Sequence, residues 1–169
     1  MTRRAVVQKW ILYSLCALAL VLVQSLLLVR VQVWGVHPFL LPAIAVIPVT
    51  LERDEGALLF SVFFGLACDL LTPVAGLPCF YALAFLVSGG LAWLLSGRVV
   101  AAGLVCSLAA AASALVVCGV LHLAVLAGGQ SVDVTAAAVL AGKEAALSLP
   151  LTVLVHYPFR RICLLTQRD

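Results

Sequence analysis

An acidic side chain in an apolar stretch is the first residue of this sequence that could do chemistry. Asp69 is the only charged residue in the range 56–97, and a carboxylate in such a setting is costly unless it has a function or a partner. Gly65 lies one helical turn before it, so a neighbouring backbone can approach just beneath the carboxylate. Pro73 then ends the helix, and Gly76 follows in a loop. Two roles are open for Asp69: contact with a partner or ligand, or hydrogen bonds from the following loop or a neighbouring helix that pin the turn.

The densest charged run of the sequence is a second candidate site, and it must lie in water. Acidic groups are favourable near the N-terminus of the helix that follows, so the run is expected to be a solvated helix cap or a contact surface for partners. Either role is preferred here to a metal or acid–base centre. The run consists of Glu52, Arg53, Asp54 and Glu55.

The usual arrangements of catalytic residues are absent from the sequence. There is no Ser/His/Asp or Cys/His set, no paired carboxylates within an apolar segment, no zinc-type histidine motif and no phosphate-binding glycine loop with a lysine. The six cysteines include no CxxC, and they are expected to pack as small apolar residues. His122 could be a ligand or a proton-relay residue, but it is predicted to be an interfacial or hydrogen-bonded histidine near the outer surface. The same is predicted for His37 and His156, which lie at segment ends. The sequence thus predicts no enzyme, no metal, no cofactor and no nucleic-acid partner.

Composition places nearly the whole chain in a lipid bilayer. Of the 169 residues, 65% are apolar and 10% are charged, whereas soluble domains carry about 25% charged residues. A single integral membrane domain, residues 1–169, is therefore expected. Its first apolar run has twenty residues without a charge, too many for a signal peptide, and is predicted to be a retained spanning helix. Six segments are predicted, at about 10–29, 39–51, 57–71, 79–95, 99–127 and 134–157.

Two features of these segments bear on how they pack. The segment 39–51 contains Pro42 and Pro48 and reaches only about 20 Å, so it is either a broken, tilted helix or a re-entrant pair. Small residues recur every four positions in the segments 79–95 and 99–127, which predicts that these two are interior helices of a compact bundle. The small residues are Ala84, Ser88, Ala92 and Ser96, and Cys106, Ala110, Ala114 and Cys118.

The distribution of lysine and arginine predicts the orientation of the chain. With six crossings and the N-terminus inside, the inner side carries eight of these residues and the outer side only Arg30. Both ends are therefore predicted in the cytoplasm. Lys143 and Glu144 lie within the last segment, where they either line an outward-facing pocket or form an interfacial patch, with Lys143 extending to the lipid headgroups. The eight lysine and arginine residues that this orientation places on the inner side are Arg3, Arg4, Lys9, Arg53, Arg98, Arg160, Arg161 and Arg168.

The stretch from Gly65 to Gly76 also carries a resemblance to a known family. Its pattern G-x-x-x-D-L-L, followed by a loop with proline and glycine and then another helix, resembles the hallmark region of the rod shape-determining protein MreD family. The short proline-containing segment before it, the chain length and the closing region from Pro150 to Arg161 are also similar to that family.

This resemblance implies a bacterial inner-membrane component of the cell-elongation machinery, with a role in cell shape and lateral peptidoglycan synthesis. Members of the family are regarded as scaffolds without catalysis, and they work beside the periplasm-spanning protein MreC, the actin-like filament MreB and a peptidoglycan synthase pair. The family is also similar in fold to the S components of energy-coupling-factor vitamin transporters, which are six-helix membrane domains. A small-solute-binding S component is therefore the alternative function. A third possible function is that of an intramembrane enzyme, which only the charged run at residues 52–55 supports.

Overall fold

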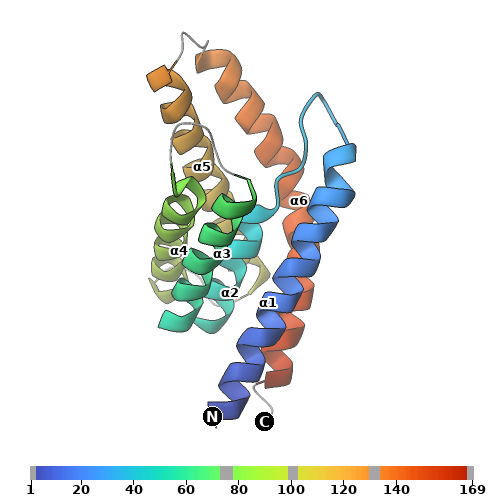
Figure 1. Ribbon diagram of the computed structural model, residues 1–169, viewed down its shortest axis with the longest axis vertical. Coiled ribbons are helices and arrows are strands. Elements are labelled where there is room, and N and C mark those ends of the chain that lie inside the picture. The colour runs from blue at the N-terminus through green and yellow to red at the C-terminus, as the bar shows by residue number, and fades with distance from the viewer. Residues whose placement is uncertain (1–2, 73–77, 99–102, 130–133, 167–169) are drawn as a thin grey trace.

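The computed structural model describes residues 3–72, 78–98, 103–129 and 134–166, and within these ranges the chain is predominantly helical (Figure 1). The one extended contact among the described residues is an antiparallel bridge between Val33 and Val36. The predicted all-α class is confirmed, and each of the six predicted segments overlaps one helix. The elements are α1 (Arg3–Leu26), a short 3₁₀ helix η1 (Leu28–Arg30), α2 (Leu41–Glu52), α3 (Glu55–Leu71), α4 (Phe80–Arg98), α5 (Leu104–Gly129) and α6 (Val134–Thr166).

The helix ends differ from the predicted segment ends where local contacts decide them. α3 begins at Glu55 rather than at residue 57, because the Asp54 side chain accepts a hydrogen bond from the backbone N–H of Ala57 at 2.8 Å and caps the first turn. α6 continues to Thr166, past the predicted end at residue 157, although two prolines lie inside it. Proline is tolerated in apolar helices where neighbouring groups satisfy the freed carbonyls.

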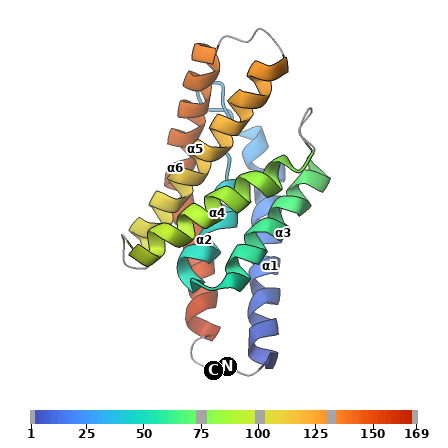
Figure 2. The ribbon, with the colours of Figure 1, turned by 90° about the vertical axis from the view of Figure 1, so that its left-hand side faces the viewer.

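Successive helices run in alternating directions, and the two ends of the chain lie at the same end of the molecule (Figure 1, Figure 2). α1 and α6 lie side by side and extend furthest toward that end. The upper parts of α5 and α6 extend furthest in the opposite direction. The shorter helices α2, α3 and α4 occupy the middle, and the turn between α2 and α3 lies toward the end that holds the termini.

α2 is the central helix of the assembly. Its ten residues from Leu41 to Thr50 are all buried, and it touches each of the other five α-helices of the described chain. With 12 residues it is about 18 Å long, too short to cross a bilayer, but protein takes the place of lipid around it. Of the two forms that the sequence leaves open, a short helix and a re-entrant pair, the structure has the continuous short helix.

The small-residue stripes of α4 and α5 are buried, as predicted, but neither helix is interior on all sides. Every member of both stripes is at most 5% exposed, and the two helices pack against each other. Their opposite faces are open, with Val87 and Trp93 exposed on α4 and Val105 and Val116 exposed on α5. The prediction of two interior helices is therefore wrong in this respect: the small residues mark one contact face, and the enclosed helix is α2.

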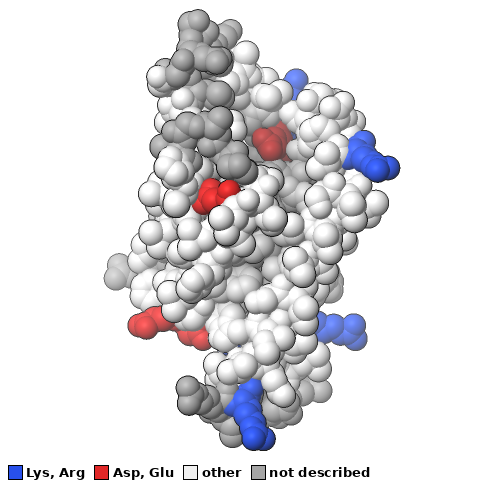
Figure 3. All heavy atoms as spheres, viewed as in Figure 1, with Lys and Arg blue, Asp and Glu red and all other residues white. Residues whose placement is uncertain are grey.

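Three of the described helical stretches are long and apolar enough to cross a membrane. They are Val6–Arg30, Leu104–Val125 and Thr135–Thr166, whereas α2 and the Phe80–Ser96 part of α4 are apolar but shorter. Most of the large apolar side chains of α1 are exposed, as expected for a helix that faces lipid. On the face shown in Figure 3, the described charged side chains lie above and below an uncharged middle. These features indicate a membrane protein.

Candidate functional site

The Asp69 carboxylate caps the start of α4. Its two oxygens accept hydrogen bonds from the backbone N–H groups of Tyr81, at 2.8 Å, and Ala82, at 2.9 Å. Both donors belong to the first turn of α4, which begins at Phe80, and N–H groups in that position have no partner within their own helix. The negative charge also faces the positive end of the α4 dipole. A carboxylate near the end of α3 thus holds the beginning of the next helix.

Gly65 lets the backbones of α3 and α4 meet one turn before Asp69. A Cβ atom on Gly65 would lie 2.7 Å from the Cα of Ala82 and 2.7 Å from the carbonyl oxygen of Tyr81. Any larger residue would have to push this backbone away. Gly65 and Asp69 therefore act on the same two residues of α4, the first by close approach and the second by hydrogen bonds. The four residues Gly65, Asp69, Tyr81 and Ala82 are called the α3–α4 clamp below.

The clamp engages both carboxylate oxygens of Asp69 within the protein. This contact corresponds to the pinning role that the sequence leaves open beside partner contact. At the end of α3, the Thr72 hydroxyl donates a hydrogen bond to the carbonyl of Cys68 at 3.0 Å. Pro73 and Gly76, the remaining residues of the predicted motif, lie outside the described residues.

The charged run at residues 52–55 divides into a buried ion pair and an exposed turn. Glu52, the last residue of α2, accepts hydrogen bonds from Lys9 Nζ at 2.7 Å and from the Tyr13 hydroxyl at 2.8 Å, one on each oxygen. The Lys9 and Glu52 side chains are only 5% and 9% exposed. The predicted solvated cap is found at Asp54 but not at Glu52, because a lysine and a tyrosine of α1 reach that carboxylate.

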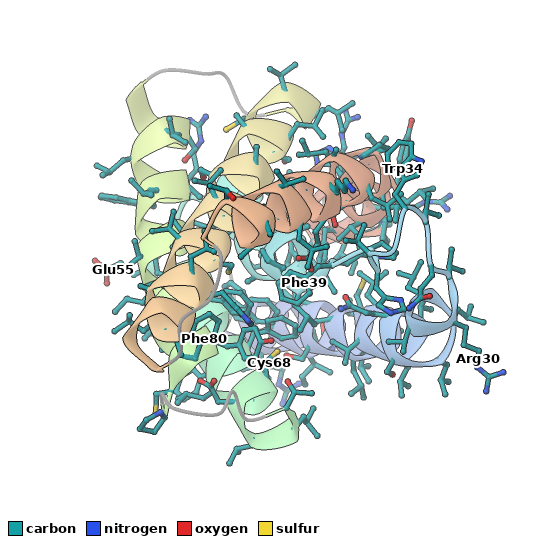
Figure 4. The ribbon with its side chains drawn as sticks, turned by 90° about the horizontal axis from the view of Figure 1, so that it is seen from above. Arg30, Trp34, Phe39, Glu55, Cys68 and Phe80 are labelled. Carbon is teal, nitrogen blue, oxygen red and sulfur yellow. The ribbon has the colours of Figure 1, made fainter. Side chains whose placement is uncertain are left out.

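The rest of the run forms the exposed turn between α2 and α3. Arg53 has a left-handed backbone conformation, with φ at 54°, and closes α2. Glu55 begins α3 and lies at the rim of the molecule when it is seen from above (Figure 4). Trp10 of α1 covers Gly56 so closely that a Cβ atom there would lie 2.9 Å from the indole ring. The turn is therefore fixed to α1 on one side and open to contact on the other.

A cavity of about 230 Å³ lies between α4, α5 and α6, beside the segment that leads into α2. An aromatic row formed by Phe39, Tyr81, Phe80 and His122 borders it. Along this row, the ring centroids are separated by 6.2 Å, 5.2 Å and 6.0 Å in turn. Phe39 lies near the middle of the helix assembly in the view from above, and Phe80 lies further toward its edge (Figure 4). Glu144 of α6 is the one acidic residue among those that line the cavity.

The neighbours Lys143 and Glu144 have different surroundings. Lys143 is exposed and does not line the cavity, whereas Glu144 is half-buried in its wall. Among the described residues, no group donates a hydrogen bond to the Glu144 carboxylate or forms an ion pair with it. His37 acts on it electrostatically. The backbone is better tied, because the Ser148 hydroxyl donates to the Glu144 carbonyl at 2.6 Å and accepts from the Phe39 N–H at 2.8 Å.

Sequence reasoning missed a buried polar cluster that joins α2, α5 and α6. Ser107 Oγ lies 3.0 Å from Thr50 Oγ1 and 3.0 Å from His156 Nδ1. All three residues are at most 2% exposed, and His156 lies inside α6 rather than at a segment end. The three residues come from three different helices and lie at least 49 positions apart in the pairs that meet, so the sequence alone gives no signal that they lie together.

The chain matches no protein-family model, no curated protein and no solved structure. Within the described ranges there is no group of three or more His, Cys, Asp or Glu side chains placed to hold a metal ion. The candidate sites are therefore the α3–α4 clamp, the turn at residues 52–55 with its ion pair, and the cavity beside Glu144. Together with the helices they indicate a helical membrane protein whose acidic groups lie in different surroundings.

Proposed function

We propose that this protein is a non-catalytic membrane scaffold of the bacterial cell-elongation complex, which contributes to the regulation of cell shape and lateral peptidoglycan synthesis. The proposal rests on the resemblance of the stretch Gly65–Gly76 to the MreD family. The observation that supports it best is the α3–α4 clamp, because it gives Gly65 and Asp69 a joint task. A helix hairpin fixed in this way presents a constant surface to partner proteins. Asp69 stabilises that surface by its hydrogen bonds to the α4 backbone.

In the proposed orientation the six helices form a multi-pass protein of the bacterial inner membrane, with both ends in the cytoplasm. α6 supports this arrangement, because Lys143 and Arg160 lie 17 positions apart, about 25 Å along the helix. That length is close to the roughly 30 Å of a bilayer's hydrocarbon core. Lys143 then lies at the outer boundary and Arg160 at the inner one. A fusion-reporter scan tests the orientation, and a reporter found outside at residue 55 or at the C-terminus would refute it.

The proposed partners are an MreC-like protein, an MreB-like filament and a peptidoglycan synthase pair. The exposed turn at residues 52–55 faces the cytoplasm in the proposed orientation and suits a cytoplasmic filament. The exposed apolar faces of α1 and α3, which include Leu15, Leu18, Phe63 and Leu70, suit lipid or the membrane helices of other components. The bilayer itself is therefore the main partner of most of this surface.

Affinity purification from native membranes tests the scaffold proposal. We expect MreC-like and peptidoglycan-synthase proteins to co-purify with the wild-type chain. Glu55→Lys, which reverses an exposed charge of the cytoplasmic turn, is expected to reduce capture of cytoplasmic partners. Arg30→Glu is the matched control, because it reverses an exposed charge at the other end and leaves the inner surface unchanged. Purification of the chain with none of these proteins would contradict the proposal.

The alternative is a small-solute-binding subunit of a vitamin-type transporter. The observation that favours it is the cavity, because Glu144 and the aromatic row provide polar and apolar walls of the kind that small molecules occupy. In the same purification, an ATPase module in place of the elongation proteins would support this alternative. A vitamin retained in equal molar amount by the purified protein would support it further.

A further inference from the structure

We propose that the cavity between α4, α5 and α6 binds an ammonium group, carried either by a small organic amine or by a lipid headgroup. This inference goes beyond the scaffold proposal, and for the transporter alternative it names the class of substrate. It does not depend on which of the two is correct, because it rests on the walls of the cavity alone.

The first argument is the unsatisfied charge of Glu144. This carboxylate lines the cavity and has no hydrogen bond or ion pair among the described residues. The other two embedded acids are satisfied, since Asp69 accepts from two backbone N–H groups and Glu52 from Lys9 and Tyr13. A carboxylate held in an apolar setting without a partner is costly. A cation that enters the cavity would remove this cost.

The second argument is the aromatic row that lines the same cavity as Glu144. Phe39, Tyr81 and Phe80 follow one another in ring contact, and Phe80 meets His122 edge to face. Aromatic faces attract cations through the negative charge of their π-systems, and the attraction is strongest where water is excluded. An ammonium group in this cavity would have both a carboxylate and aromatic rings among the groups that line its site.

The third argument is space. Small residues on α5 and α6 keep the cavity open, and a Cβ on Gly119 would lie 3.7 Å from that of Ala141. An engineered cavity of about 150 Å³ is known to hold benzene, so a cavity of about 230 Å³ has room for a ligand somewhat larger than benzene. Both a small soluble amine and the ammonium group of a lipid headgroup are small enough to enter a cavity of this size.

An ammonium group is preferred to other classes of ligand, because it alone interacts favourably with both the Glu144 carboxylate and the aromatic rings. A neutral apolar ligand would fill the aromatic side and leave Glu144 unsatisfied. An anion would be repelled by the carboxylate, and exposed Lys143 does not line the cavity to balance it.

The test uses a matched pair of probes on the purified full-length chain in phosphatidylglycerol nanodiscs. Benzyltrimethylammonium carries the cation, and neopentylbenzene has the same shape without a charge. Equilibrium dialysis should show one bound benzyltrimethylammonium per chain and at least about tenfold weaker binding of neopentylbenzene, the factor that 1.4 kcal/mol produces. Equal binding of the two probes would overturn the proposal, as would no binding of either probe.

Two variants place the binding in the cavity. Glu144→Gln keeps the size of the side chain and should weaken binding of the cation by about tenfold or more, whereas Lys143→Gln should leave it unchanged. Wild-type affinity in Glu144→Gln would refute the role of the carboxylate. Ala141→Leu, which fills the cavity, should abolish binding while Glu144 is retained. Circular dichroism and gel filtration would show that each variant is folded.

Nanodiscs that contain phosphatidylethanolamine separate the two sources of the ammonium group. If the lipid headgroup is the natural occupant, it should compete, and the affinity of benzyltrimethylammonium should fall as the phosphatidylethanolamine fraction rises. If a free amine is the natural occupant, the affinity should be the same in both kinds of nanodisc. The partner-capture experiment is unaffected by these outcomes, so the scaffold proposal and this one can fail separately.

Discussion

The Nζ atom of Lys9 in α1 lies 2.7 Å from a carboxylate oxygen of Glu52 at the end of α2, and both side chains are almost completely buried. This pair connects the first helix, which is mostly exposed, to the enclosed helix at the centre. Tyr13 adds a second hydrogen bond to the same carboxylate, and its ring stacks on Phe159 of α6 at 5.6 Å between centroids. The cluster therefore joins α1, α2 and α6 at the end of the molecule that holds both termini.

Breaking this ion pair from one side should destabilise the protein. Lys9→Met leaves the Glu52 carboxylate buried without its cation, and loss of one partner of a buried ion pair costs about 3–5 kcal/mol. We expect a lower thermal unfolding midpoint in detergent. The double variant Lys9→Met, Glu52→Met should recover much of the loss, because no charge is then left unsatisfied. Arg4→Met, an exposed neighbour, is the control and should have little effect. Equal midpoints for Lys9→Met and Arg4→Met would contradict the structural role of the pair.

Gly65→Ala should disrupt the contact between α3 and α4. The added Cβ would lie 2.7 Å from backbone atoms of α4, which cannot rotate away as a side chain can. Overpacking of this kind costs about 1–3 kcal/mol. Gly90→Ala is the matched control on α4, because a Cβ there meets nothing within 4 Å, and replacing glycine within a helix gains up to about 1 kcal/mol. The two variants should shift the unfolding midpoint in opposite directions, and equal shifts would show that the close approach is unimportant.

Asp69 substitutions separate holding α4 from contact with a partner. Asp69→Ala removes both hydrogen bonds to the α4 backbone, and charge-assisted hydrogen bonds contribute about 1.5–3 kcal/mol each. Asp69→Asn keeps one acceptor oxygen and should be intermediate. Stability is to be measured by thermal unfolding and compared with partner capture from membranes. If Asp69→Asn keeps its unfolding midpoint and membrane level but loses its partners, the carboxylate serves contact and not the clamp.

Those features of the fold and the site that depend on residues close together in the sequence could be predicted from it. Hydropathy located all six helices, and the four-residue spacing of small residues located the contact faces of α4 and α5. The motif G-x-x-x-D located the clamp, because glycine and acid one turn apart can act on one neighbouring backbone. The sequence does not show which helix is enclosed, since an enclosed helix and a lipid-facing helix are equally apolar. α2 could be recognised only from its neighbours.

The polar contacts that were missed are those between residues far apart in the chain. Lys9 and Glu52 are 43 positions apart, and Ser107 and His156 are 49 apart. The sequence shows a basic residue near the N-terminus, which the positive-inside rule already explains, and nothing in it points to a buried partner. Such pairs follow from the way α1 and α6 pack beside α2, which no local pattern records.

Neutralising Glu144 should not destabilise the unliganded protein. Because the Glu144 carboxylate has no hydrogen bond or ion pair among the described residues, its neutralisation removes the cost of a charge in an apolar setting and breaks no hydrogen bond; the one interaction lost is the electrostatic one with His37. Glu144→Gln should therefore raise the thermal unfolding midpoint in amine-free detergent or leave it unchanged, whereas Asp69→Asn should lower it. Benzyltrimethylammonium should raise the midpoint of the wild-type chain, by RT ln(1 + [L]/Kd), and that of Glu144→Gln far less. A lower midpoint for Glu144→Gln without ligand would show that Glu144 supports the fold, so that weaker binding by this variant could no longer be assigned to a missing cation partner. The unfolding midpoints of the wild-type chain and of Glu144→Gln, each measured with and without the amine, therefore show whether Glu144 binds a ligand or stabilises the fold.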